Sequence, residues 1–252
     1  MDLERERWLV RQPGAGRRLR LFCFSYAGGS AASYYAWQAG LGPHIEVCAI
    51  ELPGRAARLG EPPRRGLTAL VDTLARVIEV GDGLPFAFFG HSLGALLAFE
   101  LARHCQRRGG AQPSRLFVSG SVAPRRRSAG RLHELNDADL IAVLRQYNGA
   151  PAAVLDEPEL MALMLPTVRA DFALAADYHY RAGTPLTVPI SVYGGDSDPH
   201  VNVDELSHWQ EETSQPVLLR RFAGDHFFIQ SARQAVLAQL RYELGPLVNQ
   251  TV

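Results

Sequence analysis

The sequence predicts an α/β fold, with a mostly parallel central sheet flanked by helices. Short apolar runs rich in β-branched or aromatic residues alternate with segments of helical periodicity over most of the chain. Residues 123–189 break this alternation, because they hold helical patterns and no convincing strand. Such a stretch is too long for a loop in a compact domain, so we expect a helical lid inserted between two strands. We therefore predict a single domain over residues 1–252, with the lid insertion at about 123–189.

The predicted strands are short apolar runs bounded by Gly, Pro or polar residues, as buried parallel strands usually are. In chain order they cover residues 19–25, 45–52, 86–90, 116–120, 188–193 and, with a weaker pattern, 217–222. The helices expected between them cover residues 31–41, 67–80, 93–108, 203–212 and 230–244. Inside the insertion, residues 140–147 and 158–180 have helical patterns, and Asn136 or Asp137 is the expected N-cap of the first.

Composition and charge exclude several classes of protein. The 26 basic and 26 acidic residues cancel, so nothing indicates a nucleic-acid or membrane-surface partner. No apolar run approaches the roughly 18 residues of a transmembrane helix, and the charged N-terminus lacks the apolar core of a signal peptide. The three cysteines are scattered, as expected for small core residues in a reducing compartment. We expect a cytoplasmic protein that is a monomer.

Residues 90–94, Gly-His-Ser-Leu-Gly, match the G-x-S-x-G nucleophile elbow of serine hydrolases. They follow a predicted strand directly and open a predicted helix, which is the strand–turn–helix setting that the motif requires. The sharp turn would expose the Ser92 hydroxyl and leave the backbone N–H of Leu93 at a helix N-terminus, where it can bind an oxyanion. The alternative is an ordinary Gly-rich turn with a helix-capping serine. The flanking elements favour a catalytic Ser92.

A serine nucleophile needs a base and an acid that orients the base, and in α/β-hydrolases these follow in the order Ser, Asp or Glu, His. His226 follows the last predicted strand within a Gly-bounded turn, so we predict it as the base. Asp196 and Asp198 both follow strand 188–193; we favour Asp198 as the acid and expect Asp196 to cap the turn or the following helix. Asp225 is expected to be a loop residue that projects to the other side. Surface or structural roles are expected for the other histidines: His44, His91, His104, His133, His179, His200 and His208.

The second oxyanion donor is expected in the loop after an early strand. Residues 25–29 follow the first predicted strand and are rich in glycine, so we assign the backbone N–H of Ala27 to the oxyanion hole together with that of Leu93. Without the serine elbow, the same residues would fit an ordinary Gly-rich turn equally well.

The insertion is more apolar than one buried helix face requires, which predicts a mobile lid that forms an acyl chamber. The predicted substrate contacts are Met164, Val168, Phe172 and Phe227. The simpler alternative is that these side chains only pack the lid helices together. At the edge of the insertion, a basic cluster could be a solvated surface, or it could guide docking of an acidic partner or contact a phosphate: Arg125, Arg126, Arg127 and Arg131.

Several motifs together resemble those of the type II thioesterases that serve polyketide synthases and nonribosomal peptide synthetases, members of the α/β-hydrolase superfamily. These motifs are Phe-Ser-Tyr-Ala-Gly-Gly (24–29), Glu-Leu-Pro-Gly-Arg (51–55), Gly-His-Ser-Leu-Gly-Ala (90–95), Leu-Pro-x-x-Arg-Ala-Asp-Phe (165–172), Gly-Gly-Asp-x-Asp (194–198) and Gly-Asp-His-Phe-Phe-Ile (224–229). The resemblance implies a triad of Ser92, Asp198 and His226, with oxyanion donors at Ala27 and Leu93. It also implies an enzyme that clears aberrant or stalled acyl groups from the phosphopantetheine arms of acyl or peptidyl carrier proteins, without a metal or organic cofactor.

Other functions also fit parts of the pattern. A general esterase or a medium-chain acyl thioesterase would have the same elbow. A binding protein on a hydrolase fold would be expected to lack one member of the triad, and all three are present. The chain-terminating domain of a synthase is also possible, but a chain that begins at its own Met1 favours a discrete protein.

Overall fold

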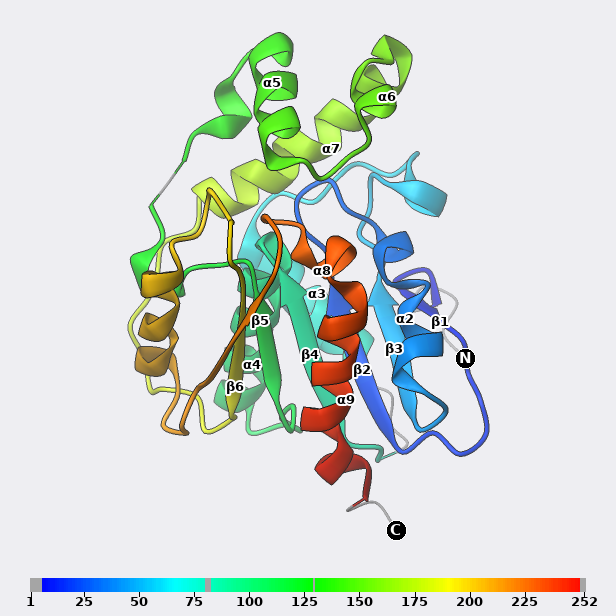
Figure 1. The fold of residues 1–252 in the computed structure, drawn as a ribbon, viewed down its shortest axis with the longest axis vertical. Coiled ribbons are helices and arrows are strands. Elements are labelled where there is room, and N and C mark those ends of the chain that lie inside the picture. Colours follow the sequence, from blue (N-terminus) through cyan, green and yellow to red (C-terminus); the bar gives the residue numbers. More distant parts are fainter. Residues whose placement is uncertain (1–5, 80–82, 129, 250–252) are drawn as a thin grey trace.

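A seven-stranded sheet with the strand order β1-β3-β2-β4-β5-β6-β7 forms the centre of the molecule (Figure 1). The computed structural model describes residues 6–79, 83–128 and 130–249. The strands are β1 (Leu9–Arg11), β2 (Leu19–Phe24), β3 (Ile45–Ile50), β4 (Phe86–His91), β5 (Leu116–Ser119), β6 (Ile190–Gly195) and β7 (Leu218–Phe222). Strands β2 to β7 pair in parallel, and β1 pairs antiparallel with β3 at the edge. The predicted mostly parallel sheet is confirmed.

All six strands predicted from the sequence are present. Those at the centre of the sheet are buried along their length, which is why they are continuous apolar runs in the sequence. The sequence prediction missed β1, because three residues ending in a partly exposed Arg11 show no strand periodicity. Its pairing of Leu9 with Ile50 depends on a partner some forty positions away along the chain.

Two layers of helices cover the two faces of the sheet (Figure 1). Side chains alternate between them: Phe22 and Phe88 pack in one core with α3 (Leu67–Ile78) and α4 (Leu93–Arg108). Cys23 and Phe89 pack in the other core with α2 (Trp37–Leu41) and α9 (Arg233–Asn249). This two-sided burial is the α/β arrangement that the sequence predicts.

The helix boundaries correct several expectations. Residues 31–41 form the short 3₁₀ segment η1 (Ala31–Tyr34) followed by α2, instead of one helix. Residues 203–212 form a 3₁₀ segment, η5 (Val203–Glu212), and the C-terminal helix begins after a separate turn, α8 (Phe228–Ser231). Helix α3 ends at Ile78, so the predicted end at Val80 lies outside the described residues. The limits of α4 are those predicted, and Gly109 ends it with a φ of 63°.

The insertion, residues 123–189, connects β5 to β6 and lies over one end of the sheet (Figure 1). It contains η3 (Pro124–Arg126), η4 (Leu132–Glu134), α5 (Asp137–Tyr147), α6 (Ala152–Leu155) and α7 (Pro158–Ala176). Asn136 is the N-cap of α5: its side chain accepts a hydrogen bond from the backbone N–H of Asp139. Helix α7 ends four residues before the predicted Tyr180.

The insertion has a small apolar core of its own. It consists of Leu140, Leu155, Met161, Leu165 and Val168. Two other apolar residues of α7, Leu160 and Leu163, are exposed. Within the described part of the chain, no helix combines the length and the apolar character needed to cross a membrane.

Candidate active site

Ser92 lies at the turn between β4 and α4, with a backbone φ of 56° and ψ of −112°. A positive φ is uncommon for a residue with a side chain, and it persists only where the surrounding structure enforces it. Here the backbone N–H of Ser92 donates a hydrogen bond to the Ser119 carbonyl at the end of β5, at 2.8 Å. The strained turn places Ser92 at the N-terminus of α4, as the elbow motif predicts.

The two glycines of the motif are required by close backbone contacts. A Cβ atom on Gly90 would lie 2.1 Å from the Gly94 carbonyl oxygen. A Cβ atom on Gly94 would lie 2.0 Å from the carbonyl oxygen of Phe24, at the end of β2. Since these neighbours are backbone atoms, a side chain at either position would push α4 away from β2 and β4.

His226 and Asp198 form a buried pair at the ends of β7 and β6. His226 Nδ1 lies 2.7 Å from Asp198 Oδ2, and the two side chains are 3% and 1% exposed. The other carboxylate oxygen of Asp198 accepts a hydrogen bond from the backbone N–H of His200 at 2.8 Å. A carboxylate at Nδ1 favours the tautomer with the proton on that nitrogen, which leaves Nε2 free to accept a proton. Nε2 is buried, and no described residue forms a hydrogen bond with it.

The two neighbouring aspartates have other partners. Asp196 forms an ion pair with Arg221 of β7 at 2.7 Å, in a half-exposed position. Asp225 accepts a hydrogen bond from the backbone N–H of Phe227 at 2.8 Å, and a second from the Asn148 side chain at 3.0 Å. Asp225 therefore stabilises the turn that carries His226 and links it to the end of α5.

The loop after β2 is held by a buried ion pair. The backbone N–H of Gly28 donates to Asp171 Oδ2 of α7 at 2.8 Å. Asp171 also accepts two hydrogen bonds from the Arg55 guanidinium, at 2.8 and 2.9 Å, and Arg55 donates a third to the Gly29 carbonyl at 2.9 Å. The side chains of Arg55 and Asp171 are 6% and 2% exposed. The peptide groups that follow Ala27 are therefore fixed from both sides.

A cavity of about 470 Å³ lies between the ends of the strands and the insertion. Five of the residues predicted for the site line it: Ala27, Ser92, Leu93, Phe172 and His226. Asp198 is not part of the lining, but it is in contact with His226. The structure therefore brings together the residues that the sequence analysis assigned to the triad and the oxyanion hole.

The other three predicted substrate contacts do not line this cavity. Met164 is half-buried on α7. Val168 lies in the core of the insertion, and its Cγ2 would be 2.8 Å from a Cβ atom on Gly28. Phe227 packs edge-on against Tyr26, with ring centroids 4.7 Å apart. Val168 therefore packs within the insertion, as in the simpler alternative, and Phe227 packs against Tyr26.

Tyr147 and His200 also line the cavity, and neither was predicted for the site. Tyr147, the last residue of α5, stacks on His200 with ring centroids 3.6 Å apart, and both rings lie within 6 Å of the His226 ring, at 5.3 and 5.7 Å. Burial and the nearby His226 lower the pKa of His200, so His200 is neutral near pH 7. The position of His200 two residues after Asp198 was a signal that could have been used. Nothing in the sequence around Tyr147 indicates that α5 would bring it here.

His91, inside the elbow, is fully buried and is not among the residues that line the cavity. Its Nδ1 lies 2.9 Å from the Ser119 hydroxyl, and its ring centroid lies 5.0 Å from that of His226. Burial, and to a lesser extent the nearby His226, hold the pKa of His91 well below its usual range. His91 is therefore a neutral structural residue beneath the site, as expected from the sequence.

Residues 19–243 match the family model of the thioesterase domain. This chain belongs to the thioesterase family. A curated relative, the gramicidin S biosynthesis protein GrsT of Aneurinibacillus migulanus, is 39% identical to this thioesterase over 248 residues, which cover 96% of this chain and 97% of GrsT.

Solved structures show the same relationship. BorB, a type II thioesterase from the borrelidin biosynthetic cluster, is 38% identical with a TM-score of 0.86, over 94% of this chain and 97% of BorB. RedJ, the thioesterase of the prodiginine pathway in Streptomyces coelicolor, is 35% identical with a TM-score of 0.85, over 93% of this chain and 91% of RedJ. The predicted α/β-hydrolase fold, the resemblance to type II thioesterases and the prediction of a thioester-hydrolysing enzyme are confirmed.

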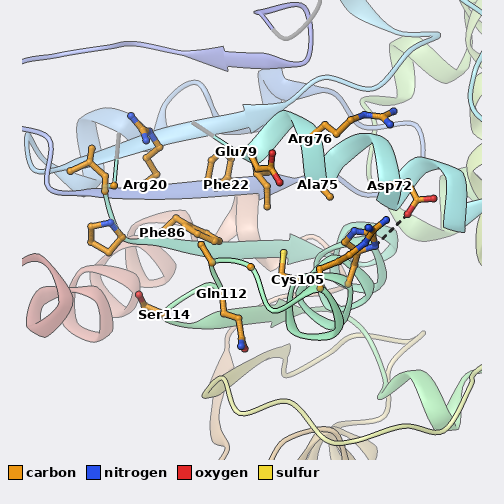
Figure 2. A pocket seen from close by; sticks show the side chains of 18 residues that line it. Arg20, Phe22, Asp72, Ala75, Arg76, Glu79, Phe86, Cys105, Gln112 and Ser114 are labelled. Atoms are coloured by element: carbon orange, nitrogen blue, oxygen red, sulfur yellow. Dashed lines mark ion pairs between the residues drawn. The ribbon is translucent and has the colours of Figure 1, made fainter. Parts of the chain in front are cut away.

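A second hollow of the thioesterase lies at the opposite end of the strands, where β2 and β4 begin, between α3 and α4 (Figure 2). Its lining includes Arg20 and Phe86, at the starts of β2 and β4, and Cys105 of α4. His104 lies there 3.3 Å from Asp72. Burial raises the pKa of the Cys105 thiol to about 11, so this thiol is protonated near neutral pH and is a poor nucleophile. The described residues of this hollow form no second catalytic centre.

The Arg55–Asp171 pair is expected to support both folding and activity. In Asp171→Asn, the Arg55 guanidinium stays buried without its ion-pair partner, which we expect to lower the free energy of unfolding by about 3–5 kcal/mol. Turnover should also fall, because the loop that contains Ala27 loses its charged anchor. Urea unfolding and hydrolysis of a model thioester measure the two effects.

Asp137→Asn is the matched control for Asp171→Asn. Asp137 also forms an ion pair with an arginine, Arg169, but its side chain is 70% exposed. Because exposed pairs contribute little, this substitution should leave stability and turnover nearly unchanged. Equal effects of the two substitutions would contradict an anchoring role for Asp171.

Proposed function

We propose that this thioesterase removes aberrant or stalled acyl groups from the phosphopantetheine arms of carrier proteins in polyketide or nonribosomal peptide biosynthesis. The proposal is supported by the relatives: GrsT is named for gramicidin S biosynthesis, and BorB and RedJ are named for the borrelidin and prodiginine pathways. The observation that carries the chemistry is that His226, paired with the buried Asp198 side chain, lines the same cavity as the strained Ser92. These three residues form the proposed catalytic triad.

In the proposed reaction, Ser92 Oγ attacks the thioester carbonyl carbon while its proton passes to Nε2 of His226. The carbon–sulfur bond then breaks, and the pantetheine thiol leaves with that proton. An acyl ester remains on Ser92. His226 next takes a proton from water, the resulting hydroxide attacks the ester, and the proton returns to Ser92 as the carboxylic acid is released.

Asp198 holds the His226 ring in the tautomer that this reaction needs and stabilises the imidazolium that forms during it. The negative charge of the tetrahedral intermediates is proposed to lie between the backbone N–H groups of Ala27 and Leu93. The Leu93 N–H lies at the N-terminus of α4, which is a favourable place for an anion.

We further propose that residues 1–252 form one domain with the insertion as a lid over the acyl group. Phe172 of α7 and Leu132 of η4 supply apolar surface to the cavity that contains Ser92. Of the four substrate contacts predicted from the sequence, only Phe172 is kept in this proposal, because the other three do not line the cavity.

A comparison of leaving groups tests the proposed substrate. With one acyl chain carried by a carrier protein, by coenzyme A and by a simple oxygen ester, kcat/KM should be highest for the carrier protein. Mass spectrometry of the carrier protein follows the first reaction directly. A general esterase would hydrolyse the oxygen ester as well as the carrier-bound thioester, and a medium-chain thioesterase would select by chain length and not by carrier.

Ser92→Ala should abolish hydrolysis, since it removes the nucleophile; a comparable substitution in subtilisin costs about 10⁶-fold in kcat. Ser92 is half-buried, and its small side chain has little packing to lose, so the melting temperature should stay near that of the wild type. A fluorophosphonate probe should label Ser92 in the wild type and no serine in the variant. Turnover that survives in Ser92→Ala would rule out the proposed triad.

Asp198→Asn and Asp196→Asn form a matched pair that tests the acid. Asp198→Asn removes the carboxylate that fixes the His226 tautomer, and we expect a loss of about 10⁴-fold in kcat, as in the corresponding serine protease variant. Asp196→Asn removes only a half-exposed ion pair and should reduce kcat little. The reverse ranking would assign the acid to Asp196.

A further inference from the structure

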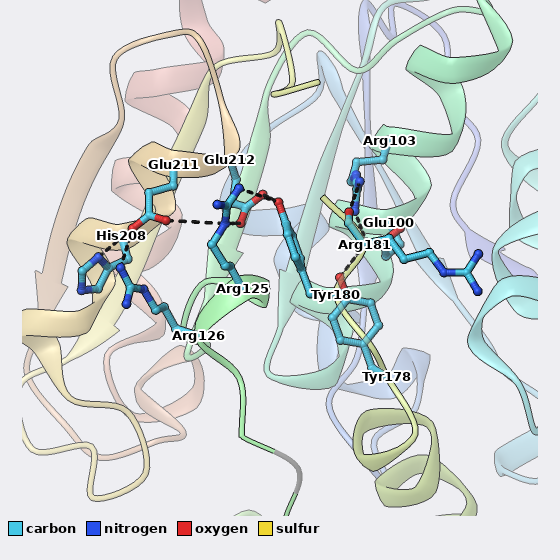
Figure 3. A network of polar contacts seen from close by, with 10 residues as sticks. All are labelled: Glu100, Arg103, Arg125, Arg126, Tyr178, Tyr180, Arg181, His208, Glu211 and Glu212. Atoms are coloured by element: carbon cyan, nitrogen blue, oxygen red, sulfur yellow. Dashed lines mark hydrogen bonds and ion pairs between the residues drawn. The ribbon is translucent and has the colours of Figure 1, made fainter. Parts of the chain in front are cut away.

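Two arginines of the basic cluster at the start of the insertion, Arg125 and Arg126, pair with acidic residues of η5 (Figure 3). Arg125 Nε lies 3.5 Å from Glu211 and 3.8 Å from Glu212, and Arg125 also donates a hydrogen bond to the Tyr180 hydroxyl at 3.1 Å. Arg126 donates to Glu211 at 2.9 Å. These two arginines are therefore part of an internal network, and their charges are not free to attract a partner.

Arg127 lines the cavity that contains Ser92, as Arg126 also does, but it differs from Arg125 and Arg126 in its partners. Its Nη1 donates a hydrogen bond to the Ser121 hydroxyl at 3.1 Å, while its Nε is out of contact with solvent and has no hydrogen-bond partner. No described carboxylate forms an ion pair with it. Burial lowers the pKa of Arg127, opposed only by Tyr178 and Tyr147, but an arginine remains charged at neutral pH.

A guanidinium in this environment is suited to bind an anion. Removing a charge from water is unfavourable unless another group compensates it, and Ser121 supplies only one neutral acceptor. The planar fork of an arginine matches the paired oxygens of a carboxylate or a phosphate. Tyr147 and Tyr178 are neutral phenols at pH 7, so they do not cancel the positive charge of Arg127.

The position of Arg127 relates this charge to the catalytic residues. Its hydrogen-bond partner, Ser121, directly follows Gly120, and a Cβ atom on Gly120 would lie 3.3 Å from Cε1 of His226. The Arg127 guanidinium is thus hydrogen-bonded to Ser121, next to the residue, Gly120, that packs against the ring of His226. An anion held by Arg127 would belong to the molecule that reacts at Ser92.

We propose that Arg127 forms an anion-binding subsite inside the catalytic cavity, which takes an anionic oxygen group of the thioester substrate. Two parts of a carrier-bound substrate have this chemistry: a carboxylate on the acyl chain and the phosphodiester of the pantetheine arm. The subsite deepens the proposed function and rests on it.

Arg127→Gln tests the subsite, since glutamine can still hydrogen-bond to Ser121 but has no charge. One pair of substrates compares malonyl and 3-methylbutanoyl thioesters of N-acetylcysteamine. Their acyl chains have similar size and branching, but only malonyl is charged. A second pair compares butanoyl thioesters of 4′-phosphopantetheine and of pantetheine. We expect kcat/KM to fall about 10- to 100-fold on the anionic member of one pair and to change little on its neutral partner. The pair that responds identifies the source of the anion.

Two further variants act as controls. Arg127→Lys keeps the charge and should restore much of the discrimination within the responding pair. Arg131→Gln removes an arginine that is 74% exposed and paired with Glu134, outside the cavity, and should change neither pair. An equal loss on all four substrates in Arg127→Gln would mean that Arg127 only holds the backbone near Ser121. That result, or no loss on any substrate, would overturn the subsite.

A binding measurement separates this proposal from the proposed function. In the Ser92→Ala background, calorimetry compares the affinity for 4′-phosphopantetheine with that for pantetheine, and for malonyl with 3-methylbutanoyl thioesters. Loss of the difference on adding Arg127→Gln supports the subsite without any turnover. If the wild type fails to hydrolyse the neutral thioesters, the proposed function fails on that ground alone, and the affinities still decide the role of Arg127.

Discussion

The buried ion pair between Arg55 and Asp171 joins three segments: the loop after β2, the loop after β3, and helix α7 of the insertion. Burying two charges is costly, and the cost is offset here because the pair is bidentate and both partners also bind the backbone of the loop at residues 28–29. The same contacts therefore stabilise the position of the insertion and the shape of the proposed oxyanion loop. A change in either segment acts on the other.

The elbow adds a second rigid connection to the same loop. Gly94 allows α4 to approach the carbonyl oxygens of Phe24 and Ser25, which begin the loop that contains Ala27. The N–H groups of Ala27 and Leu93 thus belong to two segments that are packed backbone to backbone. Donors arranged in this way need little reorganisation when charge develops between them, which is the condition for electrostatic stabilisation of a transition state.

The sequence predicts those features that depend on local pattern, and it fails where distant residues pair. Buried central strands and the elbow have local signatures, and His226 could be selected from eight histidines by its place after the last strand. Arg55 and Asp171 are 116 positions apart, so their motifs could be noticed without revealing the bond between them. The stacking of Tyr147 on His200 likewise arises only when α5 folds over the sheet. For the same reason, the three neighbouring arginines look alike in the sequence, and only the position of η5 separates the two that pair with its carboxylates from Arg127, which pairs with no described carboxylate.

The polar network of Figure 3 determines how the cavity can change shape. It holds both ends of the insertion: Arg125 binds the acidic end of η5 at one end, and at the other Tyr178 donates to Glu100 of α4 and Tyr180 to Glu212. Glu212 is almost fully buried, so moving the whole insertion would leave a buried carboxylate without its partners. Helices α5 and α6 have fewer ties to the sheet, among them the exposed hydrogen bond between Asn148 and Asp225. Movement of these two helices is instead opposed by the buried apolar core that Leu140 and Leu155 form with α7. The insertion is therefore held on the sheet by polar contacts, and its own helices are held together by apolar ones.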